Sequence, residues 1–183
     1  MKIKKQFQLN PEDFKRLALW QGISIISENQ AAVLSKIIKK HQPKKILEIG
    51  TGVGFSLSQI LISAPKTVEI TSIEYSHYLW QTNNKIFQNQ IKSGRIRLVR
   101  SDAFKFLLEA NEKFNFIFLD ASSSDYASFL ALLEDLLVSG SIIIARIKKG
   151  NAFSAGGYLE NIRKHKTEVL EFENEYFFVS QLA

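Results

Sequence analysis

A glycine-rich turn is the segment of this sequence best suited to hold a ligand. It lies within Glu48-Ile49-Gly50-Thr51-Gly52-Val53-Gly54-Phe55-Ser56, between a short apolar run and a stretch of helical length. Glycine allows a ligand to approach the backbone closely and permits positive φ angles, while a helix N-terminus offers free N–H groups. The pattern predicts a binding turn between a buried strand and a helix. The alternative is a tight strand–helix turn that binds nothing.

The spacing of the glycines indicates which kind of ligand this turn would take. A dinucleotide-binding fingerprint, G-x-G-x-x-G, would place its third glycine at position 55, where the sequence has Phe55, and the glycine is at position 54 instead. The turn therefore suits a nucleoside ligand without a pyrophosphate better than NAD. A Tyr-x-x-x-Lys pair for hydride transfer is also missing, which argues against an NAD-dependent reductase.

Carboxylates follow three of the apolar runs further along the chain. Glu74 ends the second run, about 20 residues after the turn, where a carboxylate can accept hydrogen bonds from two ribose hydroxyls. Asp102 follows the third run, where it can cap the next helix and accept from an adenine amino group. Asp120 follows the very apolar Phe114–Leu119, and a carboxylate there requires a partner. That partner would be a cofactor, a substrate or a metal.

Apolar runs alternate with helix-length stretches from residue 45 onward, which is typical of a parallel sheet covered on both faces. The expected strands are Ile46–Ile49, Val68–Ile73, Ile96–Val99, Phe114–Leu119 and Ile142–Ile144. The expected helices are 55–63, 77–92, 103–111, 126–137 and 155–166. Glu168–Phe172 and Tyr176–Gln181 flank a Glu173-Asn174 turn and predict an antiparallel hairpin at the sheet edge. The fold class is α/β, a doubly wound, mostly parallel seven-stranded sheet.

The amino-terminal part predicts two helices ahead of this sheet. Asn10 before Pro11 is a helix start, and Ser27 with Gln30 has the spacing of a capping box. Pro43 ends the second helix. We therefore expect one domain over residues 1–183, with amino-terminal helices in 1–42 and a ligand-binding α/β core in 43–183.

Composition narrows the classes of function. The 183 residues are 45% hydrophobic and 23% charged, contain no cysteine and have no apolar run long enough for a membrane span. Disulfides and thiolate chemistry are excluded, and a cytoplasmic protein without membrane attachment is expected. The net charge is +6, and residues 1–50 carry ten Lys or Arg against four acids. This excess could meet an anionic partner such as RNA, or could be a solvated lysine face.

Taken together, these segments resemble the class I S-adenosylmethionine-dependent O-methyltransferases of the catechol and caffeoyl-coenzyme A type. The resemblance covers about residues 28–149 and follows the family order. Its pieces are Leu47 to Ser56, Ser72-Ile73-Glu74, Ser101-Asp102-Ala103, Phe118-Leu119-Asp120-Ala121 with Tyr126, and Ser139 to Ala145. It implies S-adenosylmethionine as the cofactor.

The resemblance also implies a role for each matching position. Glu48 and the backbone of Gly50, Thr51, Gly52 and Gly54, with Ser56, would hold the methionine part of the cofactor. Glu74 would hold the ribose with Tyr75 beside it, and Asp102 and Ala103 would frame the adenine. Asp120 would lie between the cofactor's amino group and the reacting centre. Asp120, Arg146 and Tyr126 are the predicted catalytic residues, and further candidates for a base are Asp125 and Lys148.

Two departures from the family pattern concern its divalent metal. The family reads Asp-Ala-Asp-Lys-x-x-Tyr after the fourth strand, but Ser122 and Ser123 replace the second Asp and the Lys here. The fifth strand usually ends in Asp-Asn, which completes the metal site, whereas this chain has Arg146-Ile147. Of the three expected ligands only Asp120 remains, so a divalent metal is not expected. Arg146 would pair with Asp120 or hold an anionic substrate; the alternative is a solvent-facing strand end.

The sequence therefore predicts a metal-independent S-adenosylmethionine-dependent methyltransferase that acts on a hydroxyl acceptor. The acceptor is left open between a small molecule and a tRNA nucleoside, and a homodimer is neither favoured nor excluded. The main alternative is a cofactor-binding protein that has lost turnover and acts through a partner.

Overall fold

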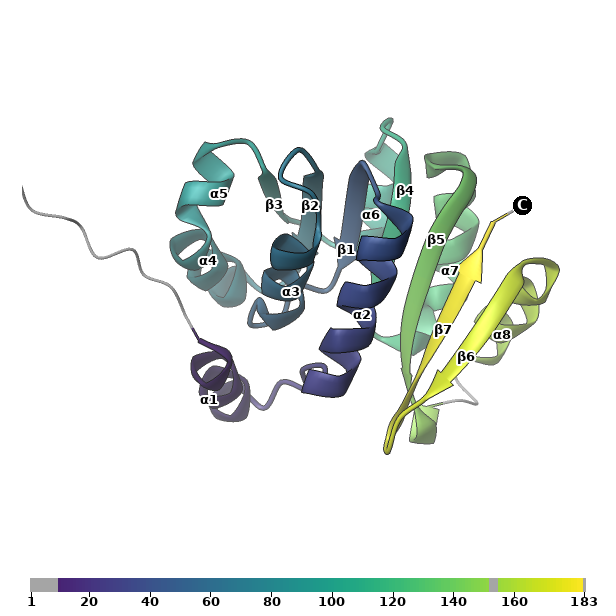
Figure 1. Cartoon of the computed structure of the whole chain (residues 1–183), viewed down its shortest axis with the longest axis horizontal. Helices are drawn as coiled ribbons and strands as arrows, with labels where there is room; N and C mark the ends of the chain where they lie inside the picture. Colours follow the sequence, from purple (N-terminus) through teal and green to yellow (C-terminus); the bar gives the residue numbers. More distant parts are fainter. Residues whose placement is uncertain (1–9, 152–154, 183) are drawn as a thin grey trace, which may run out of the picture.

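A computed structural model describes residues 10–151 and 155–182. Seven strands form one sheet in the order β3-β2-β1-β4-β5-β7-β6 (Figure 1). The strands are β1 (Lys45–Ile49), β2 (Glu69–Glu74), β3 (Ile96–Arg100), β4 (Phe114–Leu119), β5 (Leu137–Lys148), β6 (Lys166–Glu171) and β7 (Glu175–Gln181). Neighbouring strands from β3 to β5 are parallel, and β7 runs antiparallel to both β5 and β6. The predicted fold class is confirmed.

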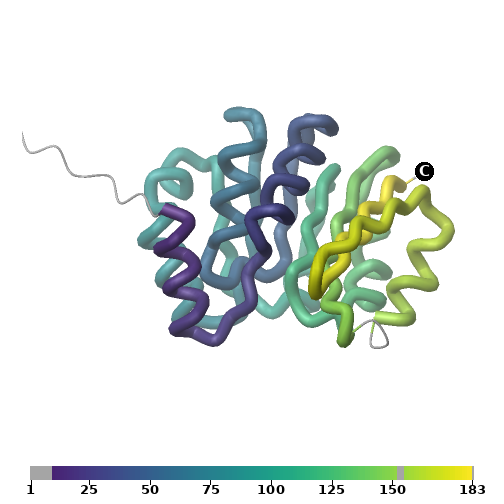
Figure 2. The backbone as a smooth tube through the Cα atoms, turned by 60° about the horizontal axis from the view of Figure 1, so that its bottom comes forward, coloured from purple at the N-terminus to yellow at the C-terminus, as the bar shows by residue number. Residues whose placement is uncertain are grey.

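Helices cover both faces of this sheet (Figures 1 and 2). One face packs with α1 (Pro11–Gln21), α2 (Glu28–His41), α3 (Phe55–Ser63), α4 (His77–Ile86) and α5 (Gln88–Lys92). The other packs with α6 (Ala103–Glu109), α7 (Tyr126–Leu133) and α8 (Gly156–Asn161). Each face has its own cluster of buried apolar side chains, and fully buried β4 residues supply both clusters. This explains why β4 is apolar at every position except the half-buried Asn115.

The two amino-terminal helices begin at the residues that the sequence predicts. The side chain of Asn10 accepts from the N–H of Asp13, and that of Ser27 accepts from the N–H of Gln30, each as part of a capping box. Pro11 is the first residue of α1. Between the helices, residues 23–26 lie beside the glycine-rich turn at the carboxyl ends of the strands.

Several expected boundaries were wrong. The helix expected over 77–92 is interrupted at Phe87, which ends α4 before α5 begins. The helices expected over 103–111, 126–137 and 155–166 end earlier, and short 3₁₀ turns follow α7 and α8. The fifth strand extends well beyond the apolar triplet Ile142–Ile144 because it pairs with β7 as far as Lys148. The carboxy-terminal hairpin is confirmed, with β6 on the outer edge.

None of the helices in the described part of the chain combines the length and the apolar character needed to cross a membrane.

Candidate active site

The chemistry-bearing side chains share one edge and one face of the sheet. The register places the last residues of β1, β2 and β4 side by side, with β5 next to β4. Side chains alternate between faces along a strand, so Glu48, Glu74, Asp120 and Arg146 all lie on the α1–α3 side. Residues far apart in the sequence therefore meet below the amino-terminal segment, at the carboxyl edge where open α/β sheets bind their ligands.

The glycines of the turn make room for the protein's own atoms. Gly50 has φ 97°, and a Cβ there would lie 2.3 Å from the backbone oxygen of Asp120. Gly54 has φ 94°, and a Cβ there would lie 2.3 Å from Oδ1 of Asn83. Asn83 in turn donates to the carbonyl of Gly52 at 2.8 Å. The turn is thus held from both sides, and a Cβ on Gly54 would point toward α4.

Glu48 is completely buried beneath this turn. Its two oxygens accept from the hydroxyls of Ser56 at 2.6 Å and Ser72 at 2.5 Å, and Ser72 also contacts the hydroxyl of Thr51 at 2.6 Å. Burial raises the pKa of Glu48 to about 8, although both serine hydrogen bonds oppose the rise. A carboxyl group with this pKa holds a proton at neutral pH, and a cation placed nearby would release it.

Glu74 connects the glycine turn to the end of β2. One of its oxygens accepts from the N–H of Gly52 at 2.8 Å and the other from the N–H of Ser76 at 2.7 Å. Burial raises the pKa of Glu74 and these backbone N–H groups counteract it. Each carboxylate oxygen has a second lone pair, so Glu74 can still accept from two ribose hydroxyls.

The residues expected at the adenine lie on the surface. Asp102 is exposed and caps α6 by accepting from the N–H of Lys105 at 3.1 Å, as the sequence predicts. Ala103 is half-buried at the start of α6, and Tyr75 is 77% exposed beside Glu74. An adenine placed here would lie in an open site, with Tyr75 free to cover it.

Arg146 is the centre of a buried hydrogen-bond network. Its Nη1 donates to Asp120 at 2.7 Å, and its Nε and Nη2 donate to the two oxygens of Glu175 at 2.8 and 2.5 Å. Nη2 also donates to the hydroxyl of Ser24 at 2.6 Å and to the carbonyl of Ile25 at 3.2 Å. The interpretation of Arg146 as a solvent-facing strand end was wrong, and its pairing with Asp120 is confirmed.

Charge and burial in this network balance each other. The side chain of Arg146 is 5% exposed, that of Asp120 14% and that of Glu175 12%. Burial alone would lower the pKa of Arg146, but the two carboxylates raise it, so it remains a cation. Burial raises the pKa of Asp120 and Arg146 opposes this, whereas for Glu175 the hydrogen bonds from Arg146 and Gln30 prevail over burial and lower the pKa.

Tyr126 does not face this site. Its side chain is fully buried, and its hydroxyl accepts from the N–H of Ala121 at 3.0 Å. The same hydroxyl lies 3.0 to 3.1 Å from the carbonyl oxygens of Leu119, Ala121 and Arg146. Burial, with a further effect of the Asp120 charge, raises its pKa well above 10. This geometry favours a structural role for Tyr126 and not the predicted catalytic one.

Four residues of the site were not predicted from the sequence: Ser24, Gln30, Ser72 and Glu175. Gln30 is 2% exposed and donates to Glu175 at 2.7 Å. A signal for Ser72 existed, since polar residues interrupt an otherwise apolar buried strand at Thr71-Ser72. A signal for Glu175 was also present, because an arginine in a buried strand requires a carboxylate, but its position was not evident.

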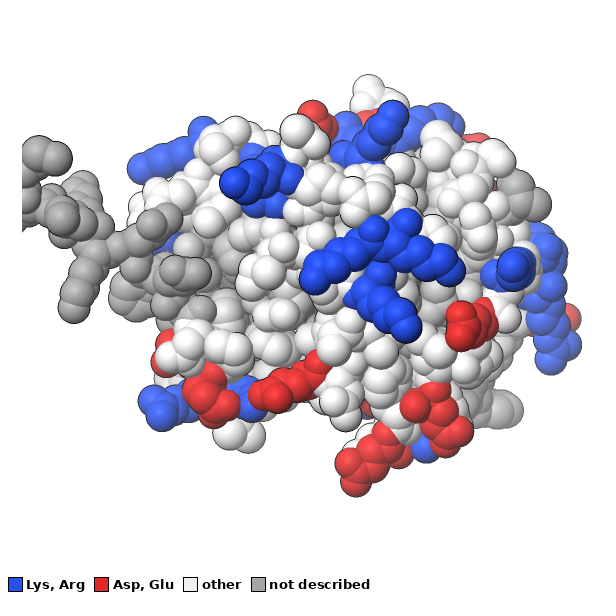
Figure 3. All heavy atoms as spheres, in the orientation of Figure 1, with Lys and Arg blue, Asp and Glu red and all other residues white. Residues whose placement is uncertain are grey.

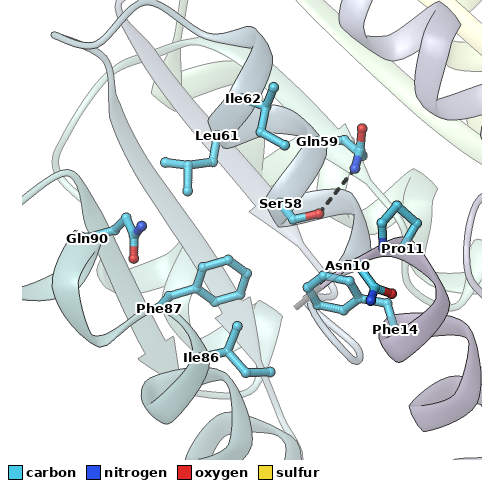
Figure 4. Close-up of a pocket in the computed structure, with 10 residues that line it drawn as sticks. All are labelled: Asn10, Pro11, Phe14, Ser58, Gln59, Leu61, Ile62, Ile86, Phe87 and Gln90. Atoms are coloured by element: carbon cyan, nitrogen blue, oxygen red, sulfur yellow. Dashed lines mark hydrogen bonds between the residues drawn. The ribbon is translucent and has the colours of Figure 1, made fainter. Parts of the chain in front are cut away.

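Three hollows accompany these residues. A small one of about 50 Å³ lies between residues 23–26, the glycine turn and Asp120. A larger groove of about 760 Å³ lies between residues 24–30 and the β6–β7 turn. The third, of about 440 Å³, lies among α1, α3 and α4–α5 and is lined by apolar and uncharged side chains such as Phe14, Leu61 and Phe87 (Figure 4). Of these three, only the first two border carboxylates of the Arg146 network: the first is lined by Asp120 and the second by Glu175.

The donor set does not fit the divalent metal that the family pattern implies. Within residues 10–151 and 155–182, no three His, Cys, Asp or Glu side chains are grouped as metal ligands. Asp120 is paired with a guanidinium where a cation would bind, and a hard cation needs several oxygen ligands. The positive charge next to Asp120 is that of Arg146.

Fold and site together define a doubly wound α/β protein with a nucleoside-type binding turn at its strand ends. The family model for O-methyltransferases matches residues 9–174, and the chain belongs to that family. It is 28% identical over 171 residues to a caffeoyl-CoA O-methyltransferase-type protein of Arabidopsis thaliana, covering 87% of this chain and 74% of that protein. The caffeoyl-CoA O-methyltransferase of Populus kitakamiensis is 26% identical over 141 residues, with 74% and 60% covered.

Solved structures share the fold at low sequence identity. The O-methyltransferase from Bacillus cereus, in complex with S-adenosylhomocysteine, has a TM-score of 0.79 at 16% identity, covering 93% of this chain and 89% of that one. The O-methyltransferase TomG from Streptomyces achromogenes, in complex with S-adenosylmethionine, has a TM-score of 0.79 at 13% identity, covering 97% and 92%.

Proposed function

We propose that this protein transfers a methyl group from S-adenosylmethionine to a hydroxyl group of a small acceptor, without a divalent metal. The observation that carries the proposal is the buried pair of Asp120 and Arg146 beside the glycine turn. Asp120 lies at the edge of the sheet where the cofactor is predicted to bind, and the positive charge next to it is a side chain of the protein, Arg146, and not a metal ion. When bound, the cofactor would supply the methyl group already activated as a sulfonium.

The residues around the turn fit this cofactor. Glu74 has lone pairs for the ribose hydroxyls, and Tyr75 is free to cover the adenine. The hollow beside Gly50 and Asp120 would receive a small polar end of the methionine part, and residues 23–26 would have to shift to admit the rest, because about 50 Å³ is room for only one or two water-sized groups. Glu48 lies directly below and would become anionic opposite a cationic ligand.

Asp120 is the residue best placed to orient the acceptor. Arg146 contacts its Oδ1, which leaves Oδ2 to accept from an acceptor hydroxyl. Burial raises the pKa of Asp120, which favours its action as a base. Arg146 holds the carboxylate in position and balances its charge. The proposed base is therefore Asp120, and Arg146 is the residue that positions it.

A small acceptor is favoured over tRNA by the distribution of charge. Exposed lysines of α2, Lys36, Lys39 and Lys40, lie toward its carboxy-terminal end, whereas the site lies near its start. Figure 3 shows Lys and Arg gathered over α2, while Asp and Glu predominate along the lower edge, where the strands end. A phosphate backbone would meet little positive charge at the site itself. The cytoplasm is the proposed location of this cysteine-free chain.

Transfer of a labelled methyl group tests the proposal. Purified protein, S-adenosylmethionine and a panel of phenols or bulk tRNA would be incubated in excess EDTA and in magnesium. We expect transfer to a phenol that EDTA leaves unchanged, and a large loss in Asp120→Asn, with Asp135→Asn, an exposed aspartate in the turn after α7, as the matched control. Strict dependence on magnesium would refute the metal-free mechanism. Tight cofactor binding without transfer to any acceptor would favour the alternative of a binding protein without turnover.

A further inference from the structure

We infer that the acceptor binds in the groove between residues 24–30 and the β6–β7 turn, and that this groove selects a small, positively charged acceptor with a single reacting hydroxyl. The inference rests on the proposed function and adds the chemical class of the acceptor. It separates this chain from the relatives named for caffeoyl-CoA, whose acceptor carries phosphates.

The groove has the size and the position of an acceptor site. Its volume is about 760 Å³, within the range of small-molecule sites. Ser24, Ile25 and Ile26 line both this groove and the hollow at the glycine turn, so one short segment separates the two. Glu175 forms part of its wall and is linked through Arg146 to Asp120. Asp120 lines the hollow and not the groove, so an acceptor lying here would reach Asp120 from the side opposite Glu74 once residues 24–26 have shifted.

The lining of the groove is acidic. Four glutamates face two lysines: Glu28, Glu171, Glu173 and Glu175 against Lys15 and Lys148. Lys15 is held between Glu12 and Glu28, at 2.8 Å from each, and so adds little free positive charge. Glu171 is paired with Lys149 at 2.6 Å, and Glu173 at the turn also acts on Lys149 but forms no ion pair of its own within the described part of the chain, so it is the glutamate of the lining most able to attract a further cation. Such a lining favours a protonated amine and repels carboxylates and phosphates.

The buried cation of the site is not available to an anion. A guanidinium has five N–H donors, and Arg146 directs its nitrogens to Asp120, Glu175, Ser24 and Ile25. An anionic acceptor would therefore lose water beside Asp120 without gaining a buried partner. Lys148, exposed at the rim, is the one lysine of the lining outside the ion pairs described above, and its charge already acts on Asp120 and Glu175, so it does not reverse the acidic character of the lining.

The pair formed by Asp120 and Arg146 determines how many hydroxyl groups the acceptor needs. A bound metal can hold two neighbouring hydroxyls at once, but the donor set here does not fit a metal. Asp120 has one oxygen to spare, so one hydroxyl is enough. A monophenol with an amine tail has the predicted chemistry.

Tyramine and 4-hydroxyphenylacetate form a matched pair of probes, because they share the phenol and differ in the sign of the tail. We expect labelled methyl transfer at subsaturating acceptor to be at least about tenfold faster with tyramine, which corresponds to about 1.4 kcal/mol. Glu173→Lys should reduce this preference several-fold. Glu109→Lys, an equal charge reversal at the far end of α6, should leave it unchanged.

Equal rates with the two probes, or faster transfer to 4-hydroxyphenylacetate, would overturn the inference, as would equal effects of the two variants. If neither probe is methylated, ligand-detected NMR with the S-adenosylhomocysteine complex decides. Binding of tyramine alone supports the inference, and binding of both, of neither or of the anion alone refutes it. Calorimetric binding of S-adenosylhomocysteine, measured in parallel, tests the proposed function separately.

Discussion

Replacing Arg146 by methionine tests the buried network most severely. The variant keeps much of the side-chain volume but leaves Asp120 and Glu175 without their cation, at 14% and 12% exposure. Removing one partner of a buried ion pair costs about 3–5 kcal/mol, because the remaining charge is left uncompensated. Since two carboxylates lose their partner here, we expect the free energy of unfolding at pH 7 to fall by an amount in the upper part of that range.

The pH dependence of this loss has a defined sign. In the wild-type protein the pKa of Glu175 is lowered, so its stabilising contribution is present above the unfolded pKa and is lost only as pH falls through the folded pKa. Without Arg146, burial is opposed only weakly and the pKa of Glu175 rises above its unfolded value. The folded variant then binds more protons than the unfolded chain. Its deficit relative to wild type should therefore shrink as pH falls from 7 to 5.

Urea unfolding followed by tryptophan fluorescence at pH 7 and pH 5 measures both effects. Arg97→Met is a matched control, because Arg97 lies on a strand and pairs with Glu112 at 2.7 Å but is 62% exposed. An exposed pair of this kind contributes less than about 1 kcal/mol. If Arg146→Met costs no more than Arg97→Met, or if its deficit grows on acidification, the reasoning about the network is wrong.

Three further predictions concern single residues. Because the pKa of Glu48 rises to about 8 on folding, the free energy of unfolding should fall as pH rises from 5 to 8. Glu48→Gln should flatten this slope. An unchanged slope in urea titrations of the variant would contradict the prediction. Gly50→Ala should destabilise the protein by about 1–3 kcal/mol more than Gly94→Ala, because Gly94 has φ 75° but open space around it. Equal thermal shifts of the two variants would contradict the clash with Asp120. Tyr126→Phe should cost about 1–3 kcal/mol, because the buried carbonyls of Leu119 and Arg146 lose the hydroxyl, yet it should keep kcat. A stable variant with a large loss of kcat would restore the catalytic role.

The sequence was sufficient for the fold because its signals are local. The alternation of apolar runs and helical stretches, the caps at Asn10 and Ser27 and the apolar length of β4 each depend on a few neighbouring residues. The same holds for Asp102 as the cap of α6. The ends of the strands were harder to predict from the sequence. The strand β5, for example, continues past its apolar triplet because β7 pairs with it.

The environment of Arg146 could not be predicted from local pattern. Its partners Glu175 and Ser24 lie 29 residues after it and 122 residues before it, and only the completed sheet and the returning hairpin bring them together. Tyr126 shows the same limit, because its neighbours in the sequence suggest the mouth of the site while the start of α7 directs its ring into the core. Long-range packing decided both positions.

Calorimetric titration of the purified protein with S-adenosylhomocysteine in excess EDTA tests the central claim most directly. We predict saturable binding of one ligand per chain, with the same affinity when magnesium replaces the chelator and a weaker affinity in Glu74→Gln. Absence of binding under both conditions, or binding only with magnesium, would contradict the proposed metal-free cofactor site.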